Sequence, residues 1–199
     1  FRRPLFGRPI IYAHASAVKV SWNYPELAYV APEEPMAKAI RKLRNVSYTA
    51  IDNRCPGYRY PRYVKSGDLL SLDYADNSFD LVICNHVLEH IKDDARAIRE
   101  LYRVCRPNGI AILMVPLQLE NALTIEENPD EELSAREREE RFGQCDHGRI
   151  YGRDYFDRLT AAGFTVGRLT PTPAQARLYA LLPAEQLIIA RKPQLPQLP

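Results

Sequence analysis

Asn85 and His86 are the polar residues best placed for chemistry, because they directly follow a segment that should be buried. That segment, Leu81-Val82-Ile83-Cys84, is apolar throughout and comes after a polar turn at Asp76-Asn77-Ser78. A run this short and apolar on both faces predicts a central strand of a parallel sheet. Ligands bind beyond the carboxyl ends of such strands. We therefore expect Asn85 and His86 to line a ligand site.

Asp52 and Asn53 hold a comparable position after a second predicted strand, residues 46–51. Residues 27–30 predict a preceding strand, and residues 36–43 carry apolar side chains at helical spacing. An acid at the tip of the second strand of a βαβ unit can accept hydrogen bonds from both ribose hydroxyls of a nucleoside. Aspartates at strand ends also form turns, so both interpretations of Asp52 stay open.

The rest of the chain continues this alternation of strands and helices. A helix is expected over residues 91–105, ended by Pro107-Asn108-Gly109, and another over residues 155–162. Further strands are expected at residues 63–65, 110–115, 164–170 and 186–191, the last two as an antiparallel pair. Strand, helix, strand order favours right-handed βαβ crossovers. The pattern predicts one α/β domain.

Two stretches closely resemble a known family. They are residues 68–90, DLLSLDYADNSFDLVICNHVLEH, and residues 99–109, RELYRVCRPNG. Both are similar to class I S-adenosylmethionine-dependent methyltransferases of the small-molecule, "type 11" kind, and the resemblance extends over roughly residues 27–192. It implies a doubly wound, Rossmann-like, mostly parallel sheet of seven strands in the order 3-2-1-4-5-7-6. It also implies in-line methyl transfer from S-adenosylmethionine to a small-molecule acceptor, with no metal evident.

The resemblance assigns cofactor-binding roles to residues at the strand tips. Asp68 is expected to bind the adenine amino group, and the backbone amide of Leu69 a ring nitrogen. Asp52 and Asn53 are expected at the ribose. Asn85 and His86 are expected to line the same site.

The turn after the first strand departs from the family, where it is usually glycine-rich. Ala31 and Glu33 stand where the first two glycines would be. A side chain and a carboxylate then occupy space that the cofactor's own carboxylate approaches. Glu33 either accepts hydrogen bonds from the cofactor's ammonium group or is a solvent-facing acid at a helix start. The departure leaves an alternative open, a catalytically inactive methyltransferase fold that serves as a binding or scaffold module.

His86 and His147 are the candidates for a general base, since histidine titrates near neutral pH. His147 lies in a polar loop, residues 142–151, at the end of an insertion over residues 116–151 that we expect to cover the site as a lid. The middle of the insertion, residues 126–141, is dense in charge and predicts a solvent-exposed helix. A further alternative is a zinc metallopeptidase, because His86-Val87-Leu88-Glu89-His90 matches the His-x-x-Glu-His signature. That signature must lie on a helix, whereas here it follows a buried strand.

Composition restricts the remaining possibilities. Lys and Arg total 27 against 25 Asp and Glu, which gives no reason to expect a nucleic-acid partner. No apolar run is long enough to cross a membrane, so we expect a soluble cytoplasmic protein. Four widely spaced cysteines argue against a zinc ribbon or a disulfide framework. Residues 1–26 are expected to form an N-terminal extension, 27–192 the methyltransferase domain and 193–199 a tail; the oligomeric state stays open.

Overall fold

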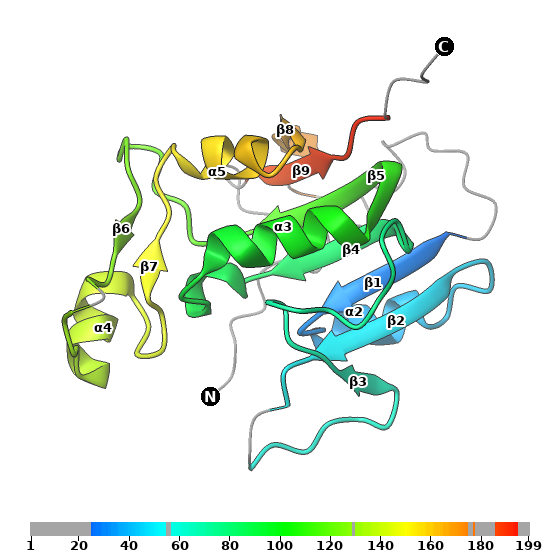
Figure 1. Ribbon diagram of the computed structural model, residues 1–199, viewed down its shortest axis with the longest axis horizontal. Helices are drawn as coiled ribbons and strands as arrows, with labels where there is room; N and C mark the ends of the chain where they lie inside the picture. Colours follow the sequence, from blue (N-terminus) through cyan, green and yellow to red (C-terminus); the bar gives the residue numbers. More distant parts are fainter. Residues whose placement is uncertain (1–24, 55–56, 129, 175–176, 178–185, 195–199) are drawn as a thin grey trace.

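The computed structural model describes residues 25–54, 57–128, 130–174, 177 and 186–194, so the expected extension lies almost wholly outside the described residues. A seven-stranded sheet forms the centre, in the order β3-β2-β1-β4-β5-β9-β8 (Figure 1). Its strands are β1 (Glu26–Val30), β2 (Ser47–Asp52), β3 (Val64–Ser66), β4 (Phe79–Asn85), β5 (Cys105–Met114), β8 (Thr165–Leu169) and β9 (Leu187–Arg191). The first five are parallel, and β9 is antiparallel to both of its neighbours.

The predicted doubly wound sheet is confirmed. Counted along the chain, the seven strands of the main sheet follow the expected order, with the last two antiparallel. One difference is an additional two-stranded sheet, β6 (Ile125–Glu126) and β7 (Arg149–Ile150), which the sequence analysis did not anticipate. It lies beside the main sheet and explains why the last strands carry the labels β8 and β9 (Figure 1).

Helices cover both faces of the sheet because successive strand residues point to opposite sides. On one face, Met36 and Ile40 of α2 (Glu34–Ile40) pack with Tyr29 and Ile83. On the other face, α3 (Asp94–Val104) and α5 (Tyr155–Ala161) pack against β4, β5 and β9. Figure 1 shows α3 crossing the sheet, with α2 behind β1 and β2.

Local signals account for the ends of the helices. The Asp93 side chain accepts a hydrogen bond from the backbone N–H of Arg96 and so caps α3. Gly163 follows α5 with a φ of 108°, which glycine adopts without strain. Within the described part of the chain, every helix is too short or too polar to cross a bilayer.

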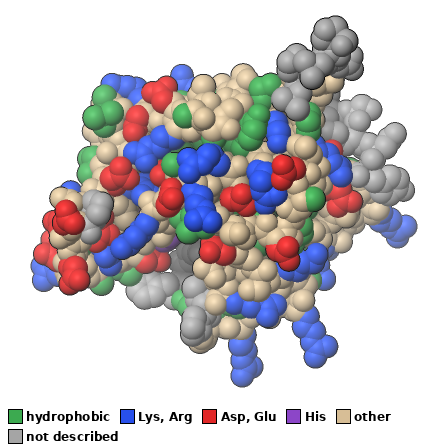
Figure 2. Space-filling model, in the orientation of Figure 1, with side chains coloured by type: hydrophobic (Ala, Val, Ile, Leu, Met, Phe, Trp, Pro, Cys, Tyr) green, Lys and Arg blue, Asp and Glu red, His purple; other side chains and the backbone are tan. Residues whose placement is uncertain are grey.

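The charged insertion contains a shorter helix than expected, α4 (Ala135–Phe142). Ser134 and Glu137 form a capping box at its start, and Gly143 ends it in a left-handed conformation. Only Phe142 of α4 is buried, so the helix is solvent-exposed as predicted. Figure 2 shows acidic and basic side chains intermingled on the visible face, in keeping with the near-neutral charge balance.

Candidate active site

Three of the expected site residues lie side by side at the carboxyl edge of the sheet. β1 runs between β2 and β4 and is parallel to both, and Val30 forms the last register pair on each side. The next residues along the three strands are Ala31, Asp52 and Asn85. Adjacent strands are about 4.8 Å apart, so these positions span roughly 10 Å, the scale of a nucleoside. The structure therefore brings together residues from three separate segments, as the sequence predicts.

The backbone is strained at two of the strand ends. Ala31 has a φ of 48° and His86 a φ of 52°, both in the left-handed region. A residue with a Cβ atom costs about 1–2 kcal/mol in that region, and such outliers concentrate at functional sites. Ala31 thus adopts the conformation that a glycine would adopt without cost. The glycine-poor turn keeps the backbone geometry of a glycine turn.

Asn85 offers a binding group that the described part of the chain does not use. The residue is 6% exposed, and its Oδ1 has no hydrogen-bond partner among the described residues. An unsatisfied buried acceptor costs about 1–3 kcal/mol, and such an atom calls for an explanation in a ligand, a water or an ion. A donor group on a bound ligand would satisfy Asn85 at this edge of the sheet.

The second expected acid, Asp68, lies close to the tip of β2. The backbone N–H of Gly67 donates to the carbonyl of Asp52 at 3.0 Å, which joins the two segments. One carboxylate oxygen of Asp68 accepts from the N–H of Leu70 at 2.9 Å, so Asp68 also shapes its own turn. Leu69 is buried and Asn53 is exposed.

Glu33 lies at the N-cap position of α2, half-buried, and its side chain does not cap the helix. Its carbonyl oxygen accepts from the N–H groups of Met36 and Ala37 at 3.1 and 2.9 Å. The main chain of Glu33 therefore starts the helix, which leaves the role of its carboxylate open.

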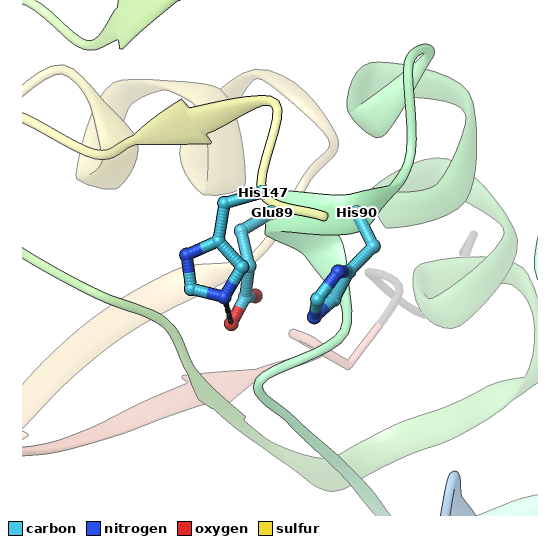
Figure 3. Close-up of side chains that lie close together, drawn as sticks. All are labelled: Glu89, His90 and His147. Carbon is cyan, nitrogen blue, oxygen red and sulfur yellow. Dashed lines mark ion pairs between the residues drawn. The ribbon is translucent and has the colours of Figure 1, made fainter. Parts of the chain in front are cut away.

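The histidines gather around a buried carboxylate. Glu89 belongs to η1 (Leu88–His90), a single 3-10 turn, and is 1% exposed. His86 Nδ1 lies 3.5 Å from Glu89 Oε1, and His147 Nε2 lies 3.9 Å from the same oxygen. The ring of His90 packs edge-on against that of His147, with centroids 4.8 Å apart. Figure 3 shows the Glu89 carboxylate between the two rings.

The two candidate bases differ in exposure. The His86 side chain is 37% exposed, at the carboxyl end of β4. His147 is buried, its Nδ1 donates to the carbonyl of Phe142 at 3.2 Å, and burial lowers its pKa in spite of the nearby carboxylate of Glu89. His147 is therefore held neutral in one orientation, while His86 is the more accessible imidazole.

The geometry does not fit the metallopeptidase signature. His86 sits in a left-handed turn, and residues 88–90 form a 3-10 turn rather than an α-helix. The two histidines of the His-x-x-Glu-His pattern are thus not one α-helical turn apart, as that class of enzyme requires. The motif directly follows the buried strand β4, where the sequence analysis placed it.

Arg149 is a structural residue that the sequence analysis missed. Its guanidinium is buried and donates to the carbonyls of Leu88, Ile91 and Lys92 at 3.1, 2.6 and 2.8 Å. The N–H of Gly148 donates to the carbonyl of Glu89 at 2.9 Å. These bonds dock the far end of the insertion on η1, next to His86. The only signal in the sequence was the polar composition of residues 142–151.

The segments joined by Arg149 also border a cleft of about 910 Å³. Its walls carry charges of both signs, from Glu89, Asp146, Arg138 and Arg158 among others, together with His90. The cleft thus reaches η1, while the carboxylate of Glu89 itself is fully buried.

Comparison with known proteins agrees with the geometry. Residues 29–113 match the family described as "Methyltransferase domain". An arsenite methyltransferase of Aquipseudomonas alcaligenes is 32% identical over 102 residues, which are 51% of this chain and 27% of that protein. The chain thus spans about a quarter of the length of the first curated relatives it matches, 27% and 23%.

Solved structures share the fold at low sequence identity. An S-adenosylmethionine-dependent methyltransferase from Mesorhizobium loti has a TM-score of 0.61 at 16% identity and covers 92% of this chain and 97% of its own. A phosphoethanolamine N-methyltransferase of Haemonchus contortus, in complex with S-adenosyl-L-methionine, has a TM-score of 0.60 at 14% identity, covering 94% and 53%. At such identities the likeness concerns the fold alone. Residues 29–113 thus resemble the methyltransferase-domain family, and the fold of the chain is that of the class I methyltransferases.

Proposed function

We propose that this protein transfers a methyl group from S-adenosylmethionine to a small-molecule acceptor. The observation that carries the proposal is the alignment of Ala31, Asp52 and Asn85 across three strand tips, with a buried Asn85 oxygen that lacks a partner among the described residues. The cofactor's sulfonium would supply an electrophilic methyl group. The acceptor must then be held in line with that group, and orientation alone can contribute ~7 kcal/mol or more.

The strand-tip residues have complementary roles in this proposal. The carboxylate of Asp52 accepts hydrogen bonds from the ribose hydroxyls, with Asn53 beside it. Asp68 and the backbone of Leu69 bind the adenine. Asn85 Oδ1 accepts from a donor group of the cofactor, which would relieve its unsatisfied state.

The methionine end of the cofactor is assigned to the turn after β1. The left-handed conformation of Ala31 supports close approach of the backbone, as a glycine would. In this proposal the carboxylate of Glu33 accepts hydrogen bonds from the cofactor's ammonium group.

The acceptor is assigned to the side of the site formed by His86 and the insertion of residues 116–151. Arg149 and Gly148 hold the far end of this insertion on η1, which supports its assignment as a lid. Where an acceptor must lose a proton, the more exposed His86 is better placed to receive it than the buried His147.

The competing candidate is a methyltransferase fold that binds a ligand without catalysis. It is favoured by one observation, that Ala31 and Glu33 place a methyl group and a carboxylate where the family has glycines. Binding of S-adenosylmethionine without transfer to any acceptor would support this alternative.

Calorimetry with S-adenosylmethionine and its demethylated product tests the proposal. We expect both to bind the wild type, and Asp52→Ala to weaken binding about 10- to 100-fold, since a hydrogen bond to a charged group is worth ~1.5–3 kcal/mol. Asp157→Ala, at an exposed position of α5, is the matched control and should bind as the wild type does. If the wild type binds neither ligand, the proposal fails even though the fold is right.

Methyl transfer itself is then followed with radiolabelled S-adenosylmethionine. A panel of small molecules bearing oxygen, nitrogen, sulfur or arsenic nucleophiles is offered as acceptors. Label transferred to any of them supports the enzyme, and cofactor binding with no transfer to any of them supports the inactive module.

A further inference from the structure

We propose that Glu89, His90 and His147 form a binding site for one divalent transition-metal ion of the zinc class. Their candidate ligand atoms all lie within 4.8 Å of one another. The set comes from two distant parts of the chain, η1 and the loop before β7, which face each other in Figure 3. Two imidazoles and one carboxylate are a ligand set that zinc accepts in proteins.

The burial of Glu89 is the first independent observation. Its side chain is 0% exposed, and neither carboxylate oxygen has a hydrogen-bond partner within the described part of the chain. A buried charge is ordinarily paired at close range or bound to a metal. The nearest cationic candidates are His86 and His147, at 3.5 and 3.9 Å, which is beyond the range of a strong charge-assisted hydrogen bond. A cation between the two imidazole rings would explain why the Glu89 carboxylate is buried without a hydrogen-bond partner among the described residues.

The orientation of the two rings is the second observation. His90 Nδ1 donates to the carbonyl of Asp146 at 3.0 Å, and His147 Nδ1 donates to the carbonyl of Phe142 at 3.2 Å. A carbonyl can only accept, so each Nδ1 carries the proton and each Nε2 keeps its lone pair. Metal-binding histidines are held in this way, with the second nitrogen bonded to a carbonyl or a carboxylate.

The size of the site and its access are compatible with an ion. Bonds of ~2.0–2.1 Å in a tetrahedral site place ligand atoms roughly 3.3 Å apart. His147 Nε2 and Glu89 Oε1, at 3.9 Å, need to approach by about half an ångström, and the widest pair, within 4.8 Å, by up to about 1.5 Å. His90, whose side chain is 24% exposed, also lines the cleft of about 910 Å³, which provides an entry path. Three protein ligands leave a fourth position for water or a substrate atom on the side of this cleft.

The ion would fasten the insertion to the sheet. His147 belongs to the insertion, while Glu89 and His90 follow β4, so coordination would join the two next to His86. The site differs from the metallopeptidase pattern, which uses His86 and His90. It also departs from the expectation of no metal, which rested on the resemblance to methyltransferases.

Metal titration of tag-free full-length protein tests the site. The protein is stripped with a chelator, loaded with Zn²⁺ and desalted, and zinc is quantified by mass spectrometry and by competition with a chromophoric chelator. We expect one zinc per chain, and at least ~10-fold weaker binding in His147→Gln and in Glu89→Gln. Cys145→Ser, two residues from His147, is the matched control and should bind as the wild type does. His86→Gln should keep the one-to-one stoichiometry.

Spectroscopy of the wild type avoids dependence on variants that could fold poorly. Cobalt added to the stripped protein should give the intense visible absorption of a four- or five-coordinate site with nitrogen and oxygen ligands, and Zn²⁺ should displace it. Absence of stoichiometric zinc from the wild type, or wild-type affinity in folded His147→Gln and Glu89→Gln, would overturn the proposal. Calorimetry with S-adenosylmethionine on the same stripped sample keeps this outcome separate from the proposed methyl transfer.

Discussion

Replacing Arg149 should unfasten the insertion from η1 and destabilise the whole chain. Its guanidinium donates to three backbone carbonyls, those of Leu88, Ile91 and Lys92, and bonds Glu126 at 3.0 Å. Arg149→Met keeps much of the side-chain volume but removes every one of these donors. The three carbonyls then stay buried without a donor, and leaving a buried acceptor unsatisfied costs more free energy than the hydrogen bond contributes on balance.

The expected loss is about 3–5 kcal/mol, the range for removing one partner from a buried ion pair. The energies of the individual Arg149 hydrogen bonds are not added together, since water and small backbone shifts would satisfy some of the three carbonyls in the variant. Net stability of a domain is typically ~5–15 kcal/mol, so the variant should lose a large share of it. With a urea slope of ~2 kcal/mol per molar, the unfolding midpoint should fall by roughly 1.5–2.5 M.

Urea unfolding followed by circular dichroism measures this loss, and hydrogen exchange at residues 88–92 locates it. Arg158→Met is the matched control, because Arg158 also bonds Asp94 and Glu126 but its side chain is 25% exposed, against 6% for Arg149. A partly exposed pair is worth ~0–1 kcal/mol, so the control should lose about 1 kcal/mol. Arg149→Lys keeps the charge but cannot reach all three carbonyls, and should also be destabilised. Equal shifts for Arg149→Met and Arg158→Met would refute the reasoning.

Three other predictions concern single positions. Hydrogen bonds from Arg103 hold the pKa of Glu100 below its ordinary value. The contribution of Glu100 to stability is therefore complete above the ordinary glutamate pKa and is lost as the pH falls through the lowered pKa. Glu100→Gln should lower the urea midpoint at neutral pH and not in acid, and a loss that is constant with pH would contradict this. Gly163→Ala should cost about 2 kcal/mol by thermal unfolding, because φ is 108° and the new Cβ would lie 2.8 Å from the Tyr102 ring. Gly143→Ala, with φ of 80° and no described atom within 4 Å of the new Cβ, should cost only about 1 kcal/mol, and equal costs would speak against the Tyr102 contact. Ala31→Gly relieves ~1–2 kcal/mol of backbone strain but costs ~0.5–1 kcal/mol, because the unfolded chain gains conformational entropy, so the free energy of unfolding should change by no more than about 1 kcal/mol. Calorimetry should show equal or tighter binding of S-adenosylmethionine. Weaker binding would contradict the proposed role of the turn.

The main sheet could be predicted because its signals are local and repeated. Apolar runs such as residues 81–84 mark buried strands, and helical spacing separates them along the chain. Connection rules then leave few ways to order the strands. The same rules placed Asp52 and Asn85 at one edge, since the carboxyl ends of parallel strands meet there. The pair β6–β7 escaped prediction because strands this short carry almost no periodic signal.

The surroundings of Glu89 could not be predicted because they depend on contacts between distant segments. Glu89 is 58 residues from its neighbour His147. The loop that contains His147 is held against η1 by hydrogen bonds from Arg149 to backbone carbonyls. Every residue has a backbone carbonyl, so the sequence does not reveal which carbonyls accept these bonds. The spacing of four residues pairs His86 with His90 only if the segment is an α-helix, because residues i and i+4 share a face in that conformation. The left-handed turn at His86 prevents that helix, and the cluster with His90 takes His147 as its second histidine, although His86 also lies 3.5 Å from Glu89.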